Sequence, residues 1–177
     1  MGHALLGTGT ILVQRIQDQK HLLINARAEG VETKPSFRGP VRHRRCIIPA
    51  SGFYEWRRQG AGKQPYFVHP AADELFAFAG IWDHWQGKQG EVLESAAILT
   101  TVANGLMQPI HDRMPVILEK EDVAGWLDPA TELARVLTML RPCPSERMVA
   151  YPVSSVVNSA RYDGPECVAR VNEMAPG

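Results

Sequence analysis

Residues 45–57 read Arg-Cys-Ile-Ile-Pro-Ala-Ser-Gly-Phe-Tyr-Glu-Trp-Arg and hold two short apolar runs separated by a Ser-Gly pair. Ile, Phe, Tyr and Trp favour strands, and residues typical of turns bound each run. We therefore expect strands over Arg45–Pro49 and Gly52–Arg57. The same pattern recurs along the chain, which favours a strand-rich fold over a helical bundle.

Six further strands are predicted by these signals, over Leu22–Ala26, Pro65–His69, Leu75–Trp82, Ala96–Thr101, Pro115–Leu118 and Met148–Val153. The segment Gln59–Lys63 contains two glycines and is typical of a hairpin loop. Helices are expected over Glu119–Leu127, Ala130–Leu140 and, more briefly, Ala28–Thr33, from acidic first turns, apolar spacing and the prolines that follow. The predicted class is α+β, mostly antiparallel β.

Length and composition predict one soluble domain. The chain has 177 residues, of which 45% are hydrophobic and 21% charged, which excludes a disordered chain. No apolar run approaches the roughly 18 residues of a membrane span. Three cysteines without zinc-like spacing argue against a disulfide scaffold or a metal site and suit a reducing cytoplasm.

The formal net charge of zero conceals an uneven distribution. Residues 1–63 carry 11 basic and 4 acidic side chains, a net charge of +7, and the remaining residues carry 8 and 15, a net charge of −7. This balance argues against a uniformly basic coat, and it leaves room for a local anion site in the first third of the chain.

Two segments contain side chains suited to catalysis or anion binding. Asn25 and Arg27 are two apart on an extended segment and therefore point to one side, where they can hold a phosphate or an oxyanion. The alternative is that Asn25 caps a helix. Glu55 lies in an aromatic strand, where a desolvated carboxylate suits acid/base chemistry. Its alternative is an ordinary ion pair with Arg57 or Arg58.

Two more segments complete the candidate set. His111 lies in a loop between Pro109 and Pro115 and can move protons near neutral pH, although a loop histidine satisfied by Asp112 explains it equally. The basic run Arg38–Arg45, with Phe37 before it and Trp56 in the next strand, combines cations and rings as single-stranded DNA sites do. Its alternative is a solvated loop.

Taken in order, these blocks are far more specific than any one alone: Asn-Ala-Arg-Ala-Glu (25–29), the 45–56 stretch, Lys-Gln-Pro-Tyr-Phe (63–67), Phe-Ala-Gly-Ile-Trp (78–82), Ile-Leu-Thr-Thr-Val-Ala-Asn (98–104) and Ile-His-Asp-Arg-Met-Pro-Val-Ile-Leu (110–118). The chain thus resembles the SOS-response-associated peptidase family, also called SRAP domains. The resemblance implies a single α+β domain over residues 21–170 with a barrel-like core and a DNA groove. Residues 1–20 match nothing in it, and 171–177 form a tail.

Members of that family bind single-stranded DNA at abasic sites in the SOS response. They crosslink to the DNA through a cysteine at position 2, whose amine and thiol form a thiazolidine with the opened sugar, and the peptidase name reflects N-terminal self-processing. The resemblance also implies a monomeric cytoplasmic protein, associated with the nucleoid, without cofactor or metal.

By the same resemblance, three residues are catalytic: Asn25 positions the opened sugar, Glu55 transfers protons, and His111 assists ring opening. Arg27 and Arg113 hold phosphate and Trp56 stacks near the lesion. Phe37, Arg38 and Thr100 complete the expected DNA-binding set.

The sequence departs from the family at its beginning. Position 2 is Gly2, and the family's Met-Cys-Gly-Arg-Phe opening is absent. A truncated reading frame, a misassigned start codon or a natural variant explains this, and we favour the first two because the downstream residues are intact. None of Cys46, Cys143 and Cys167 is a convincing substitute nucleophile. Two other functions are therefore kept: a non-covalent single-stranded DNA-binding module, and a small-molecule hydrolase that uses His111 and Glu55.

Overall fold

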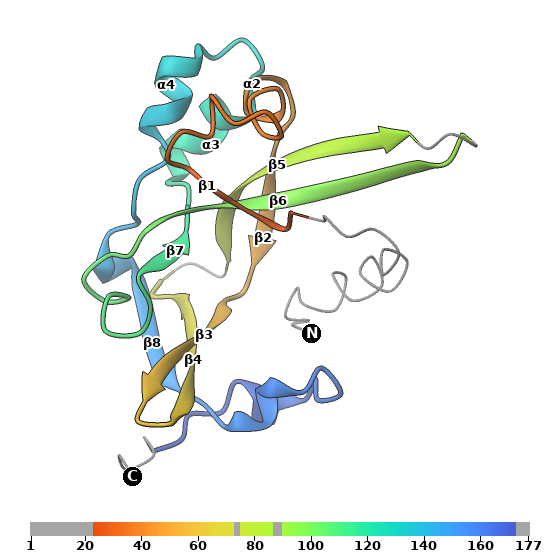
Figure 1. The fold of residues 1–177 in the computed structure, drawn as a ribbon. Helices are drawn as coiled ribbons and strands as arrows, with labels where there is room; N and C mark the ends of the chain where they lie inside the picture. The colour runs from red at the N-terminus through yellow and green to blue at the C-terminus, as the bar shows by residue number, and fades with distance from the viewer. Residues whose placement is uncertain (1–22, 73–74, 87–89, 173–177) are drawn as a thin grey trace.

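The structure is a computed structural model that describes residues 23–72, 75–86 and 90–172. Its strands form two sheets, one above the other in Figure 1. The upper sheet contains β1 (Asn25–Arg27), β2 (Arg45–Ala50), β5 (Phe76–Gln86), β6 (Val92–Val102) and β7 (Arg113–Pro115), and the lower sheet contains β3 (Phe53–Gln59), β4 (Gly62–Pro70) and β8 (Met148–Pro152). The upper order is β1-β6-β5-β2 with β7 paired to β6, and the lower order is β3-β4-β8.

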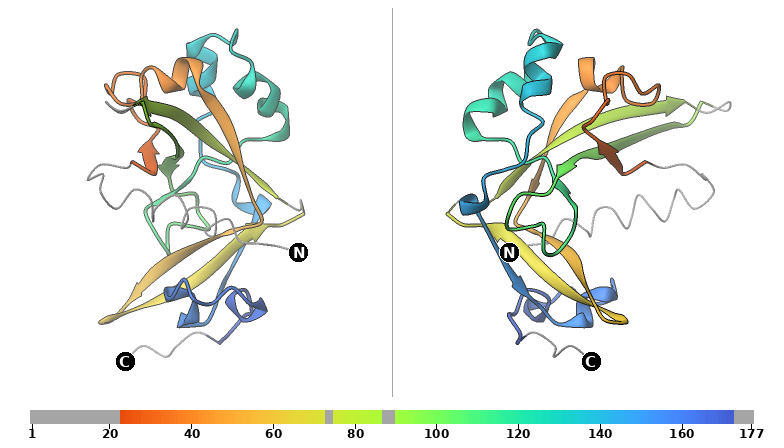
Figure 2. Two further views of the ribbon diagram at one scale, coloured as in Figure 1. Left: turned by 90° about the vertical axis from the view of Figure 1, so that its right-hand side faces the viewer. Right: turned by 60° about the vertical axis from the view of Figure 1, so that its left-hand side comes forward.

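Three short helices and three 3-10 turns complete the described chain: α2 (Pro40–His43), α3 (Lys120–Leu127), α4 (Leu133–Thr138), η1 (Ser145–Arg147), η2 (Ser155–Asn158) and η3 (Pro165–Cys167). Both views of Figure 2 show the helices at the end of the molecule opposite the β3–β4 hairpin. Every strand pair is antiparallel except β1 with β6. The predicted α+β class is confirmed, with two open sheets rather than a closed barrel.

The elements differ from the predicted ones where local geometry overrides the pattern. The helix expected over Ala28–Thr33 is wrong: the segment forms turns, because Gly30 has a φ of 70°, which no α-helix accommodates. The expected hairpin is confirmed, with Gly60 at a φ of 56°. The strand expected over 22–26 runs from Asn25 to Arg27, and residue 22 lies outside the described residues.

Two other bounds shift. The helix expected over Ala130–Leu140 is confirmed only for Leu133–Thr138. The strand expected over Pro115–Leu118 begins two residues earlier, and its later part crosses to β5, where the amide of Leu118 donates to the Ala77 carbonyl at 2.8 Å. This crossing holds the loop before β7 against the body of the upper sheet.

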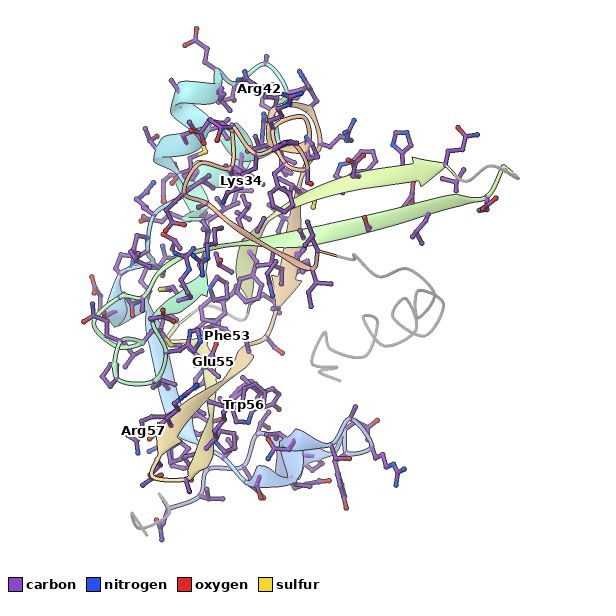
Figure 3. The ribbon with its side chains drawn as sticks, in the orientation of Figure 1. Lys34, Arg42, Phe53, Glu55, Trp56 and Arg57 are labelled. Carbon is purple, nitrogen blue, oxygen red and sulfur yellow. The ribbon has the colours of Figure 1, made fainter. Side chains whose placement is uncertain are left out.

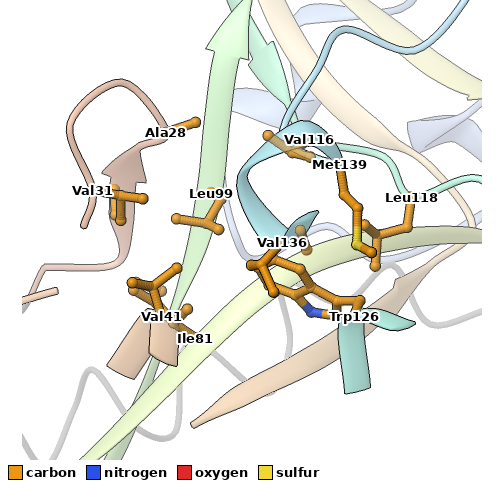
Figure 4. Packing of buried hydrophobic residues seen from close by; sticks show 13 residues of the cluster. Ala28, Val31, Val41, Ile81, Leu99, Val116, Leu118, Trp126, Val136 and Met139 are labelled. Atoms are coloured by element: carbon orange, nitrogen blue, oxygen red, sulfur yellow. The ribbon is translucent and has the colours of Figure 1, made fainter. Parts of the chain in front are cut away.

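The described residues form two hydrophobic clusters, an upper one that packs the helices against the upper sheet and a lower one that both sheets share. Trp126 fills the upper core together with Leu99, Val136 and Met139 (Figure 4), and its indole N–H donates to the Cys46 carbonyl at 2.8 Å. The lower cluster surrounds Val68, Phe78, Met107 and Met114, among other residues. The two-residue link Ser51–Gly52 joins β2 in one sheet to β3 in the other.

Arg45 holds the ends of two helices. Its guanidinium donates to the carbonyls of Trp126 (2.6 Å), Asp128 (2.6 Å), Arg42 (2.7 Å) and Val41 (3.0 Å). These carbonyls lie at the C-termini of α3 and α2, where a helix lacks internal donors. Burial lowers the pKa of this guanidinium, yet its acceptors all favour the charged form. The last arginine of the basic run therefore has a structural role.

Candidate functional site

A cleft of about 510 Å³ separates the lower sheet from the loop that connects β6 to β7. Residues of the β3–β4 hairpin line one wall, and 108–112 line the other. Glu55 and Trp56 thus face the same cleft as His111, although they are far apart in the sequence. Figure 3 shows Glu55, Trp56 and Arg57 together on β3. The fold therefore unites one predicted catalytic pair with one predicted stacking residue.

The aromatic strand fixes Glu55 and Trp56 in place. Glu55 is half-buried, and one carboxylate oxygen accepts the amide of Trp56 at 3.1 Å. The indole N–H of Trp56 donates to the Asn158 side-chain oxygen at 2.8 Å, so the ring orientation is set by η2. At the start of β3, Phe53 packs against Phe78 with ring centroids 5.9 Å apart. A carboxylate and an oriented ring thus lie next to each other at the cleft.

His111 is anchored at one nitrogen and exposed at the rest of its ring. Its Nδ1 lies 3.0 Å from the amide nitrogen of Arg113, 3.2 Å from the Arg113 carbonyl and 3.2 Å from the Asp112 carboxylate, and 42% of its side chain is exposed. When Nδ1 accepts the Arg113 amide proton, the neutral ring carries its own proton on Nε2. When the ring is protonated, the carbonyl and the carboxylate accept from Nδ1. The surroundings accommodate both protonation states that a proton donor uses.

The guanidinium of Arg113 is already engaged. It donates to both oxygens of Glu29, at 2.7 and 2.8 Å, and to the carbonyl and hydroxyl of Thr100, at 2.6 and 3.2 Å. Arg113 holds the pKa of the Glu29 carboxyl below its usual value, with a smaller contribution from Lys34. The predicted phosphate contact by Arg113 therefore competes with a carboxylate that occupies the same face of its guanidinium.

Asn25 and Arg27 share one side of β1, as the alternation predicts. Both are exposed, and Ala26 between them is buried. Arg27 pairs in register with Thr100 on β6, which in turn holds Arg113. The alternative that Asn25 caps a following helix is wrong, because turns follow Arg27. The pair is thus placed on the upper sheet, beside the strand that carries the Arg113 contact.

The side chains in and beside the basic run have different surroundings. Phe37 packs against the upper core, Arg38 is exposed ahead of α2, and Arg44 pairs with Asp83 at 3.1 Å. None of these residues lines the cleft described above. Figure 3 places Arg42 of this run in the upper part of the molecule, away from Glu55 and Trp56.

Four residues at or beside the site were not among the predicted catalytic or DNA-binding residues. Glu29 ends the Asn-Ala-Arg-Ala-Glu block, but its partner Arg113 lies 84 positions away. Asn158 lies 102 positions from its partner Trp56. Arg58 and Lys63 line the cleft from the two ends of the predicted hairpin loop. Their cross-strand pairing follows from the two-residue turn, so it could have been predicted from the sequence.

None of the three cysteines lines the cleft. Burial raises the pKa of the Cys46 and Cys143 thiols, which keeps them protonated, and Cys167 is buried. Gly2 lies outside the described residues. Among the residues that the structure describes, no group of three metal-binding side chains is placed to hold an ion, and no helix has the length and apolarity to cross a membrane.

The chain is similar to several known proteins. The chain is 44% identical over 156 residues to abasic site processing protein YoqW of Bacillus subtilis, covering 86% of this chain and 70% of the relative. It is 37% identical over 174 residues to abasic site processing protein HMCES of Gallus gallus, of which it spans 51%. A crystal structure of a Bacteroides thetaiotaomicron protein matches with a TM-score of 0.79 and 37% identity, over 84% of this chain and 66% of that one.

The family model for SOS response associated peptidases matches residues 10–160. That stretch includes both sheets, the cleft and the loop with His111. The chain belongs to the SOS response associated peptidase (SRAP) family.

Proposed function

We propose that this chain processes abasic sites in single-stranded DNA as part of the DNA-damage response, at nucleoid DNA in the cytoplasm and as a monomer. The observation that carries the proposal is the cleft in which Glu55, Trp56 and His111 meet beneath a rim of cations. Its relatives bear the name abasic site processing protein. A lesion without a base leaves a gap that a protein ring can fill, and Trp56 is oriented for that contact.

The chemistry required at an abasic site matches these side chains. The sugar is mostly a closed hemiacetal, so its ring oxygen must be protonated before the aldehyde forms. The exposed part of the His111 ring can donate that proton, because Nδ1 is held by the Arg113 backbone. Glu55 then removes a proton from an attacking amine and returns one to the leaving water. Asn25 supplies an amide donor for the developing charge.

The covalent step depends on the N-terminal residue. A free α-amine condenses with the C1′ aldehyde to give an imine and one water. A cysteine thiol at the same residue then adds to the imine carbon, its proton passes to nitrogen, and a stable thiazolidine ring closes. Gly2 has an amine and no thiol. We therefore propose a reversible imine for the printed sequence and a stable crosslink, with the associated cysteine-type self-processing, for a chain that begins with cysteine after Met removal.

The test uses one labelled single strand with a central abasic site and a matched strand with thymine there. Fluorescence anisotropy measures binding, and denaturing electrophoresis with and without cyanoborohydride detects adducts. We expect the protein to bind the abasic strand more tightly than the thymine strand. The chain with Gly2 should give an adduct band only after reduction. The G2C variant should give a heat-stable adduct band without reductant. Equal binding of the two strands and no band from either chain contradict the proposal.

A non-covalent single-stranded DNA-binding module is the second candidate. It is favoured by the half-buried Cys46 and the buried Cys143, whose thiol pKa values burial raises, together with Gly2 at position 2. In that case the abasic strand is still bound tightly, and no band appears for Gly2 even after reduction.

A further inference from the structure

We propose that Arg58 and Lys63, opposite each other on the β3–β4 hairpin, form a phosphate site that guides single-stranded DNA away from the cleft. The inference rests on the proposed function and adds the path of the strand beyond the lesion. It places contacts with the DNA phosphates on the β3–β4 hairpin, whereas the sequence suggested the run Arg38–Arg45.

The two cations are held close to each other by the strand register. Arg58 and Lys63 are Cα partners in the antiparallel β3–β4 pair, one step before the two-residue turn. Directly opposed residues project from the same face of a sheet, with Cβ atoms about 5 Å apart. Both side chains are exposed, and both line the cleft that holds Glu55 and His111.

Like charges in directly opposed positions destabilise a strand pair. Three arginines elsewhere in the described chain have compensating partners: Arg113 has Glu29, Arg44 has Asp83, and Arg45 has four carbonyls. Within residues 23–72, 75–86 and 90–172, neither Arg58 nor Lys63 has an ion-pair partner. A bound polyanion removes the repulsion, so the arrangement indicates a ligand with at least one phosphate.

The neighbouring ring identifies the class of ligand. Trp56 precedes Arg58 by two positions, so the two side chains lie on one face of β3, about 6.6 Å apart along the strand. Asn158 fixes the ring. A stacking surface followed by a cation pair suits an unpaired base and the phosphate next to it. Arg57 also lines the cleft, and its guanidinium lies 5.0 Å from the centre of the Tyr66 ring.

The experiment measures the salt dependence of binding to the abasic single strand, by anisotropy at several salt concentrations. Each phosphate contact contributes about 0.7 to the slope of log K against log salt for single strands. We expect the double variant R58A/K63A to reduce the slope by about 1.4 and each single variant by about half of that. The matched control K120A/R135A removes the same charge from the exposed helical end and keeps the wild-type slope.

A second variant separates binding from folding. K63E places opposite charges across the hairpin, so its melting temperature should rise while its affinity for DNA falls below that of R58A/K63A. An unchanged slope in R58A/K63A, when the wild-type protein prefers the abasic strand, overturns this inference and leaves the proposed function intact. A wild-type protein without that preference overturns the proposed function itself. An equal loss of slope in K120A/R135A also overturns the inference, because a general charge effect then explains it.

Discussion

Arg113 binds Glu29 through two parallel hydrogen bonds, of 2.7 and 2.8 Å, that join β7 to the turn after β1. The same guanidinium holds the Thr100 carbonyl at 2.6 Å, and its backbone amide holds His111. One arginine thus ties three strands of the upper sheet to the histidine loop. The Glu29–Arg113 ion pair thus fixes the strand whose backbone amide holds His111.

Glu29→Gln should lower the free energy of unfolding by about 1 kcal/mol at neutral pH, a modest value because half of the Glu29 side chain is exposed. The folded pKa of Glu29 is lowered, so its stabilisation is complete above the unfolded pKa and is lost as pH falls through the lower folded pKa. The difference between wild type and E29Q should therefore be constant near neutrality and shrink in acid. Urea unfolding at a series of pH values checks this, and a difference that grows in acid contradicts it.

Arg45→Ala should destabilise the fold by about 2–3 kcal/mol, because the carbonyls at two helix ends lose a charged donor. Arg45→Lys should recover only part of this loss, since an ammonium cannot reach four carbonyls as a planar guanidinium does. Chemical denaturation monitored by circular dichroism gives both values. An Arg45→Lys variant as stable as the wild type would contradict this, because it would show that the charge alone is sufficient.

Asn158→Ala should weaken binding of the abasic strand about threefold to tenfold, because the Trp56 indole loses the acceptor that orients it. Quenching of tryptophan fluorescence by DNA should weaken in the same proportion. Asn158→Asp keeps an acceptor oxygen and serves as the matched control for orientation, with a charge penalty that salt screens. If the alanine variant binds as wild type does, the ring does not need this anchor.

Glu55→Gln and His111→Asn should each slow adduct formation on the abasic strand by about 100-fold, the usual scale for a lost general acid or base. Binding should change little, since neither change removes a cation. Single-turnover gels over a time course give the rates, and anisotropy gives the affinity. A parallel loss of affinity and rate would mean that these residues hold the DNA rather than move protons.

Gly52→Ala should cost several kcal/mol, because an added Cβ meets the Phe67 ring and the Val68 carbonyl at 2.5 Å. The neighbouring change Ser51→Ala lies in the same link and is the natural control. Thermal melting of both variants distinguishes the close approach from a general sensitivity of the link.

Local signals predicted the parts of this fold that depend on neighbouring residues. The β3–β4 hairpin follows from its aromatic strands and two-residue turn, and α3 follows from its acidic first turn and apolar stripe. The turns at 28–33 were missed because the left-handed Gly30 breaks a helical pattern that its neighbours support. Helix propensity sums over a segment, and one backbone conformation overrides that sum.

Three predicted residues, Glu55, Trp56 and His111, line one cleft, but the sequence predicted few of the contacts that hold them. The alternation of side chains along β1 predicted that Asn25 and Arg27 lie on one side of the strand. The contacts of Arg113 with Glu29 and of Trp56 with Asn158 join distant segments, so no periodic pattern contains them. The basic run looked uniform in the sequence, yet packing assigned Arg45 to two helix ends.

The Ser51–Gly52 link carries the chain from one sheet to the other, and a shared hydrophobic cluster packs the two sheets together beside the cleft. Glu55 and Trp56 belong to the lower sheet, and His111 belongs to the upper one. Because Phe53 of the lower sheet packs against Phe76 and Phe78 of the upper sheet, this shared packing sets the spacing between the walls that carry Glu55 and His111. A substitution that loosens this aromatic packing should therefore alter the alignment of the two side chains without changing either of them.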